Sequence, residues 1–213
     1  MDINNISINT QSSIRIEFEK IIYFDPFKID DSNNDADIIF ITHDHYDHLD
    51  IESINNIKKD STIVVAPLSI KDKIESINFS KYYYLNSNDE IDLDDIHVKA
   101  VHAYNLNKNY HKKEYNWLGY LITYKDITYF IAGDTDANED NLLVKCDVAI
   151  IPIGGTYTMD YKEASDYLKR INPSVAIPTH YGSIIGSTSD GKHLKDLLKD
   201  TSIEVIEKLN FSE

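Results

Sequence analysis

Residues 42–48 contain four side chains of the types that bind transition metals. His43, His45, Asp47 and His48 lie within six residues, and an extended or turning backbone can direct alternate side chains to a common point. Imidazole and carboxylate groups are ligands that zinc, iron and manganese accept. A polar surface loop is the alternative, but three of the chain's eight histidines are concentrated here beside an aspartate. The pattern therefore predicts a metal site.

The elements around this segment place it after a buried strand. Residues 38–41 are continuously apolar, which is typical of a strand covered on both faces, and the first histidine follows two residues later. Apolar runs bounded by polar breaks predict further strands along the chain. The full set of expected strands is 13–18, 21–24, 37–41, 62–65, 82–85, 96–101, 118–124, 127–132, 148–151, 175–177 and 203–206.

The clearest helical pattern runs from Asp160 to Ile171. Asp160 can cap the helix while Glu163 reaches back to it, and apolar residues recur at helical spacing before Asn172 and Pro173 end the segment. Hairpins combined with helices between strands indicate an α/β protein with mixed sheets. The length of 213 residues requires only one domain, so we expect residues 1–213 to form a single unit.

Composition excludes several kinds of ligand and partner. Cys146 is the only cysteine, so a thiolate cluster cannot bind the metal and no intramolecular disulfide can form. With 36 acidic and 21 basic residues the net charge is −15, which disfavours nucleic acid as a partner. No secretion signal or membrane span is evident. We expect a cytoplasmic protein, not bound to a membrane, that acts on a small molecule, with its oligomeric state open.

The segment 42–48 resembles the HxHxDH signature of the metallo-β-lactamase superfamily. Asp25 lies in a Phe-Asp-Pro-Phe segment before it, Asp134 in a Gly-Asp-Thr segment after it, and His180 near the end of the pattern. The resemblance covers about residues 12–185, including residues 151–159. It implies a four-layer αβ/βα sandwich, with two mixed β-sheets and helices outside. It also implies one or two bound metal ions, zinc first, with manganese or iron as alternatives.

The resemblance assigns roles to the signature residues. His43 and His45 would bind one metal ion. Asp47 and His48 would bind a second, which His180 would join. Asp47 would also orient or deprotonate the attacking water.

Two aspartates outside the signature receive different roles from the resemblance. Asp134 would bridge two ions, because a carboxylate has two oxygens; a turn residue is the alternative. Asp25 would support the ligand loops by hydrogen bonding without touching metal.

The family's remaining histidine has three candidates in this chain. His97 lies inside an expected strand, whose alternation already explains it. His102 stands at a strand end, where ligands of this fold emerge, but the resemblance places Tyr104 nearer the expected position. His111 precedes Trp117 and matches related hydrolases with an Ala-Tyr-Asn segment. We favour His111 over His102, and a first site without a third histidine stays open.

The implied activity is hydrolysis of a small ester, lactone or phosphodiester by a metal-activated hydroxide. The pattern is closest to lactonase-like and phospholipase D-like hydrolases. The chain has no Gly-x-Ser-x-Gly elbow, and Cys146 lies in no recognisable motif, so no side-chain nucleophile is indicated. The alternatives are a di-iron redox enzyme, an RNA-processing nuclease and a non-catalytic metal-binding protein. The His43-x-His45 spacing argues against the first, and the negative charge against the second.

Several other features have two interpretations each. Lys108, Lys112 and Lys113 form a local basic group that either attracts an anionic substrate or is a solvated loop, and we favour the loop. Tyr104 and Tyr181 either assist catalysis or pack, and packing is favoured in a chain with 15 tyrosines.

Overall fold

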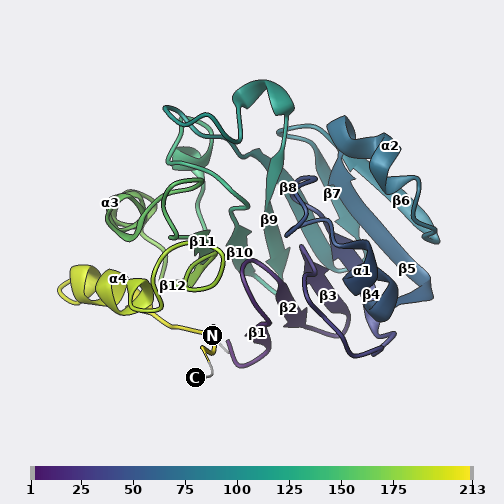
Figure 1. Ribbon diagram of the computed structural model, residues 1–213, viewed down its shortest axis with the longest axis horizontal. Helices are drawn as coiled ribbons and strands as arrows, with labels where there is room; N and C mark the ends of the chain where they lie inside the picture. The colour runs from purple at the N-terminus through teal and green to yellow at the C-terminus, as the bar shows by residue number, and fades with distance from the viewer. Residues whose placement is uncertain (1–2, 212–213) are drawn as a thin grey trace.

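Two β-sheets packed against each other form the centre of the computed structural model, which describes residues 3–211 (Figure 1). The first sheet has the order β1-β2-β3-β4-β5-β6 and the second β13-β12-β11-β10-β9-β8-β7. Strands β1 to β3 are antiparallel and β3 to β6 parallel, while β7 to β10 are antiparallel and β10 to β13 parallel. Both sheets are therefore mixed, as predicted.

The strands of the first sheet are β1 (Ile6–Ile8), β2 (Ile14–Glu17), β3 (Ile21–Phe24), β4 (Ala36–Phe40), β5 (Lys58–Pro67) and β6 (Lys81–Leu85). Those of the second sheet are β7 (Glu90–Leu93), β8 (Ile96–His102), β9 (Leu118–Tyr124), β10 (Ile127–Ile131), β11 (Val148–Pro152), β12 (Val175–Thr179) and β13 (Glu204–Val205).

Within residues 3–211, four α-helices cover the outer faces of the sheets. Helices α1 (Ile51–Ile57) and α2 (Lys71–Ile74) lie beside the first sheet, and α3 (Tyr161–Ile171) and α4 (Asp190–Leu198) beside the second (Figure 1). Short 3-10 helices occur at Leu68–Ile70, Lys113–Tyr115 and Asn141–Leu143. The four-layer sandwich is confirmed. No helix in the range 3–211 is long and apolar enough to cross a lipid bilayer.

Strand β4 shows why its sequence is continuously apolar. Ile38 and Phe40 belong to the core between the sheets, whereas Ile39 and Ile41 belong to a second cluster that includes residues of α1 and α2. All four are almost fully buried. Each buried side chain of this size contributes about 1.5–3 kcal/mol. The strand is thus packed on both faces, and the segment of candidate metal ligands that follows it starts from a rigid support.

Helix α3 forms as the sequence predicts. The Asp160 carboxylate accepts hydrogen bonds from the backbone N–H groups of Lys162 and Glu163, each at 2.8 Å, and the Glu163 carboxylate accepts from the Asp160 N–H at 2.9 Å. Asn172 ends the helix with a left-handed backbone. The buried face consists of Ala164, Ser165, Tyr167, Leu168 and Ile171.

Some elements were not predicted because their sequence signals are short or mixed. Strand β1 has three residues, and β7 alternates two acidic with two apolar residues. Strand β5 begins at Lys58, four residues before the expected start, in a polar stretch. Strand β13 spans two residues where residues 203–206 were expected. Helices α1, α2 and α4 have at most nine residues each, which gives little periodicity to detect.

Candidate metal centre

Four connections bring the predicted ligands to one edge of the sandwich. The segment with His43, His45 and His48 follows β4, Asp134 follows β10, and His180 directly follows β12. The carboxyl ends of parallel strands in an α/β fold commonly form such sites. His111 arrives differently, from the long connection between β8 and β9.

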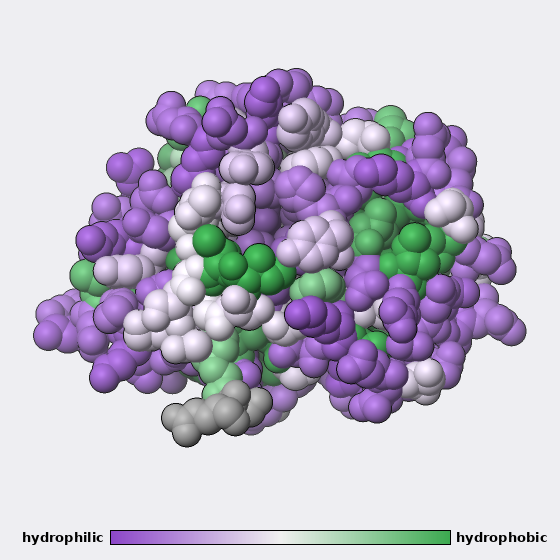
Figure 2. All heavy atoms as spheres, viewed as in Figure 1, coloured by the Kyte–Doolittle hydropathy of each residue, from purple (hydrophilic) through white to green (hydrophobic). Residues whose placement is uncertain are grey.

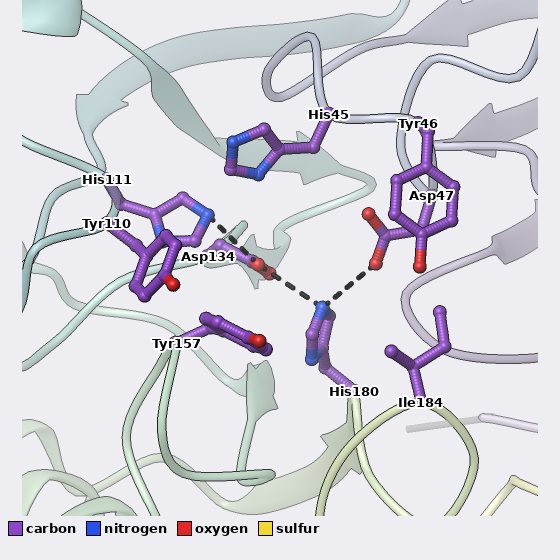
Figure 3. Close-up of a pocket in the computed structure, with 9 residues that line it drawn as sticks. All are labelled: His45, Tyr46, Asp47, Tyr110, His111, Asp134, Tyr157, His180 and Ile184. Atoms are coloured by element: carbon purple, nitrogen blue, oxygen red, sulfur yellow. Dashed lines mark ion pairs between the residues drawn. The ribbon is translucent and has the colours of Figure 1, made fainter.

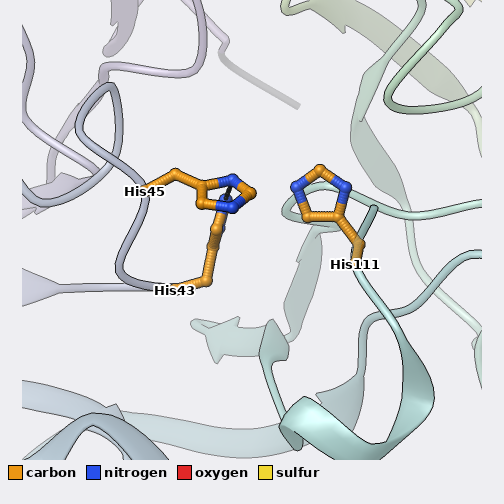
Figure 4. A group of neighbouring side chains, drawn as sticks. All are labelled: His43, His45 and His111. Carbon is orange, nitrogen blue, oxygen red and sulfur yellow. Dashed lines mark hydrogen bonds between the residues drawn. The ribbon is translucent and has the colours of Figure 1, made fainter. Parts of the chain in front are cut away.

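His43, His45 and His111 form the first group of candidate ligands. Each offers a ring nitrogen, and these nitrogens all lie within 4.8 Å of one another. The Nε2 of His43 lies 3.1 Å from the Nδ1 of His45. Figure 4 shows His111 facing the other two rings across the group. His43 and His111 are buried, and His45 is half-buried.

Asp47, His48 and His180 form the second group. Their ligand atoms also lie within 4.8 Å of one another. The Nε2 of His180 is 3.3 Å from the Oδ2 of Asp47, and the Nε2 of His48 is 3.8 Å from the same oxygen. This is the set that the family resemblance implied for a second ion.

Asp134 lies between the two groups. Its Oδ1 is 3.4 Å from the Nε2 of His48. Its Oδ2 is 3.2 Å from the Nε2 of both His111 and His180 (Figure 3). One carboxylate thus faces a histidine of the first group and two of the second. That position is the one a bridging ligand requires.

Several polar atoms of the cluster are buried without a hydrogen-bond partner. They are the Nε2 of His48 and of His111, the Oδ1 of Asp134, and both ring nitrogens of His180. Buried polar atoms are nearly always paired, and each unpaired one costs about 1–3 kcal/mol. Imidazole nitrogens and carboxylate oxygens are the donors that first-row transition metals prefer. The residues therefore fit a pair of metal ions.

Asp25 supports the ligands from behind. Its carboxylate accepts hydrogen bonds from the backbone N–H of Thr42 at 2.7 Å and from the Thr42 hydroxyl at 2.6 Å, and it lies 2.7 Å from the Nδ1 of His48. The Thr42 hydroxyl also lies 2.9 Å from the Nδ1 of His43. A carboxylate on the far nitrogen orients a ligand histidine and increases its basicity. Asp25 occupies the supporting position that the resemblance implied.

The electrostatics of the cluster combine burial with close opposite charges. Burial acts to lower the pKa of His48, but Asp134 and Asp25 outweigh it and raise that pKa well above its usual value. Burial opposes ionisation of Asp134, yet His180 and His48 hold its pKa well below the usual range. Burial and the nearby His48 lower the pKa of His43. The buried carboxylate is thus held in its charged form by neighbouring positive charge.

Backbone conformation at the site is unusual. Asp25, His111 and His180 have φ angles of 45°, 54° and 55°, in the left-handed region that non-glycine residues seldom adopt. Such conformations persist only where the surrounding structure fixes them. Gly154 makes the approach of His180 possible, because a Cβ there would lie 2.1 Å from the His180 carbonyl oxygen.

The rival histidines lie elsewhere. His97 is exposed, and its Nδ1 is 2.8 Å from Asp92. The Nε2 of His102 is 3.0 Å from the carbonyl oxygen of Lys113. Neither belongs to a group of candidate ligands, whereas His111 does.

Tyr104 and Tyr181 do not line the cavity at the cluster. The Tyr181 hydroxyl is 3.3 Å from Glu207, and the Tyr104 ring contacts His102. Packing and hydrogen bonding account for both.

A cavity of about 230 Å³ opens beside the cluster. Figure 3 shows the side chains around it. Besides five of the candidate ligands, the lining contains Tyr46, Tyr110, Tyr157 and Ile184. These four residues were not predicted from the sequence. Tyr46 lies inside the signature, but nothing in the sequence distinguishes the other tyrosines from the rest of the chain's 15.

Comparison with known proteins identifies relatives of the chain. The family model described as "Beta-lactamase superfamily domain" matches residues 6–180. A UPF0173 metal-dependent hydrolase of Sulfolobus acidocaldarius is 35% identical over 169 residues, covering 74% of this chain and 71% of that protein. One from Pyrococcus horikoshii is 28% identical over 209 residues, covering 91% of each.

The fold has a counterpart among solved structures. A protein from Parabacteroides distasonis, described as a metal-dependent hydrolase, matches with a TM-score of 0.83 and 29% identity, covering 96% of this chain and 93% of that one. The geometry of the cluster and these likenesses agree. The chain belongs to the metallo-β-lactamase superfamily, within its UPF0173 metal-dependent hydrolases.

Proposed function

We propose that this enzyme uses two zinc ions to hydrolyse a small ester, lactone or phosphodiester. The observation that carries the proposal is the position of Asp134, whose two oxygens face both groups of ligands. His43, His45 and His111 would hold one ion, and Asp47, His48 and His180 the other. Zinc at this site would polarise the bond to be cleaved and make water a better nucleophile at neutral pH.

Asp47 is the residue best placed to handle the proton of the attacking water. Its carboxylate belongs to the second group and also lines the cavity. One of its oxygens lies 3.3 Å from the Nε2 of His180. The group can therefore accept a hydrogen bond from water and orient it towards a substrate in the cavity.

Water, not a side chain, is the nucleophile in this proposal. Among the residues that line the cavity in the described structure there is no serine, threonine or cysteine. Cys146 packs against the core, and burial raises the pKa of its thiol to about 12. A small-molecule substrate is supported by the size of the cavity and by the net charge of −15, which disfavours polyanions.

The test combines metal analysis with turnover. The metal-stripped protein is reloaded with zinc, manganese or iron and assayed on esters, lactones and phosphodiesters. We expect two equivalents of metal and highest activity with zinc. His45→Ala should lower metal content and hydrolysis together, whereas His97→Ala, an exposed histidine outside the cluster, should change neither. Unchanged metal content in His45→Ala would contradict the proposal.

A further inference from the structure

The cavity beside the metal cluster has two apolar walls. Tyr110 and Tyr157 form one, with ring centroids 4.7 Å apart in an edge-to-face arrangement. Tyr46 and Ile184 lie on the other side of the ligands, as Figure 3 shows. Tyr46, Tyr110 and Ile184 are 66%, 47% and 40% exposed. Large apolar side chains exposed around one cavity indicate a binding surface.

The wall of Tyr110 and Tyr157 is built into the structure by Asn105. The buried Asn105 amide nitrogen donates to the carbonyl oxygen of Tyr110 at 3.0 Å and to that of Tyr157 at 2.7 Å. The Asn105 backbone N–H donates to the carbonyl oxygen of His111 at 2.7 Å. One residue thus fixes both tyrosines relative to a candidate metal ligand. The wall is pre-organised, which reduces the entropic cost of binding.

Two of the three lysines in the basic group are paired with carboxylates, and the third, Lys112, is exposed and does not line the cavity. Lys108 pairs with Asp136 and, at 3.4 Å, with Glu163. Lys113 pairs with Glu139 at 2.6 Å. Within the described structure, neither a lysine nor an arginine lines the cavity. In Figure 2 green and white residues interrupt a mostly purple surface near the middle of the face shown.

The metal ions and the cavity walls would contact different parts of a substrate: the ions its reacting group, and the walls the remainder. The ions would attract the carbonyl or phosphoryl oxygen of any of these groups, so they would not select among esters, lactones and phosphodiesters. The walls contact the remainder of the substrate, and they offer aromatic and aliphatic surface without a positive charge. A carboxylate or phosphate in that remainder would lose water without gaining a partner.

We propose that the cavity selects substrates whose remainder is uncharged and aromatic or branched aliphatic, held between the Tyr110–Tyr157 wall and the Tyr46–Ile184 wall. The proposal rests on the proposed function for the presence of metal. It goes beyond it by assigning specificity to four residues that are not ligands. Asn105 is the positioning residue for the first wall.

Binding of two hydroxamic acids tests this without any turnover. Both chelate the metal through the same group, but benzohydroxamic acid carries a neutral ring and succinic monohydroxamic acid a carboxylate. Calorimetric titration of the zinc-loaded protein should show the aromatic compound binding at least ~10-fold more tightly, because ring contacts add to chelation. Equal affinities, tighter binding of the carboxylate or failure of both to bind would overturn the proposal.

Variants connect the preference to the walls. Tyr110→Ala and Tyr157→Ala should each weaken benzohydroxamic acid ~3- to 10-fold while barely changing the other compound. Ile184→Lys should strengthen the carboxylate compound ~2- to 5-fold, the range of an exposed ion pair. Leu197→Ala, an exposed residue of α4, is the matched control. Unchanged preference in all three wall variants would also overturn the proposal.

The two proposals can fail separately. If no ester, lactone or phosphodiester is hydrolysed but the hydroxamates discriminate as described, the proposed function fails and the assignment of the walls stands. If hydrolysis requires metal but the two hydroxamates bind equally well, the proposed function stands and the assignment of the walls fails. Melting temperatures of each variant establish that the fold is retained.

Discussion

The histidines after β4 and the histidines from distant loops are held in different ways. The Nδ1 atoms of His43 and His48 have partners, the Thr42 hydroxyl at 2.9 Å and the Asp25 carboxylate at 2.7 Å. The Nδ1 of His180 has no hydrogen-bond partner, although the residue is buried. His111 belongs to the irregular connection of residues 103–117, between β8 and β9.

This difference shows which part of the centre the protein builds by itself. The first half comprises the histidines after β4, which cuts across the two groups of ligands named above. It starts from a strand buried on both faces, and a carboxylate and a hydroxyl orient its rings. The second half comprises the histidines from the distant loops, and within residues 3–211 neither has a carboxylate or hydroxyl behind its ring. The Nδ1 of His111 lies 3.3 Å from the Asn105 amide nitrogen, and that of His180 has no partner. We therefore expect the first half to be pre-organised and the second to be completed by metal binding.

The largest effect should come from the residue that joins the halves. Asp134→Asn keeps the shape of the side chain but removes the charge that faces His48, His111 and His180. We expect metal affinity and hydrolysis to fall by more than ~100-fold, exceeding the loss typical of supporting residues. Elemental analysis and a chelator competition measure it, with the partly exposed Asp140, changed to Asn, as control. Retention of two metal equivalents would contradict the bridging role.

A smaller effect should follow from weakening the support of the first half. Asp25→Asn leaves one neutral amide to satisfy Thr42 and His48, so at least one of three contacts loses its acceptor. Metal affinity should drop ~10- to 100-fold, the usual cost of such changes. The melting temperature should fall as well, because the group is buried. An affinity equal to that of the unchanged protein would show that the first half needs no such support.

Sequence reasoning worked best where the signal is local. The residues 42–48, Asp134 and His180 each follow a strand whose apolar run is visible in the sequence, so their place at one edge follows from the parallel strand order. His111 required a choice between two histidines, because its position depends on contacts with Asn105. The cavity walls escaped notice since Tyr110 and Tyr157 are 47 residues apart and meet only in the fold.

Removing the metal should speed amide hydrogen exchange in the second half of the centre more than in the first. In hydrogen–deuterium exchange, we expect residues 103–117 and the segment after β12 to exchange at least ~10-fold faster without metal, and the end of β4 to change little. Zinc at 100 times its dissociation constant should add about 2.7 kcal/mol of stability. For a chain of this length that raises the melting temperature by roughly 5–10 °C. Equal increases in exchange in both halves would refute the comparison.

The smallest effect concerns Gln11, which lies in the turn between β1 and β2 and is fully buried. Its carbonyl oxygen accepts the backbone N–H of His180 at 3.0 Å, yet its side-chain amide has no hydrogen-bond partner, like the Nδ1 of His180. When the Nε2 of His180 binds metal, its Nδ1 carries a proton and needs an acceptor. The Gln11 amide oxygen is a candidate, because it is buried without a donor and belongs to the residue that bonds the His180 backbone.

The substitution Gln11→Leu separates two explanations. If the amide serves His180, the change should weaken binding of the second ion about 5-fold and leave the first unaffected, as a stepwise zinc titration would show. If the amide is merely unpaired, an apolar side chain of similar size should leave metal binding unchanged and keep or raise the melting temperature, because replacing an unsatisfied buried polar group removes a penalty. The second outcome would mean that His180 depends on the metal alone for its orientation, whereas His48 is oriented by the Asp25 carboxylate.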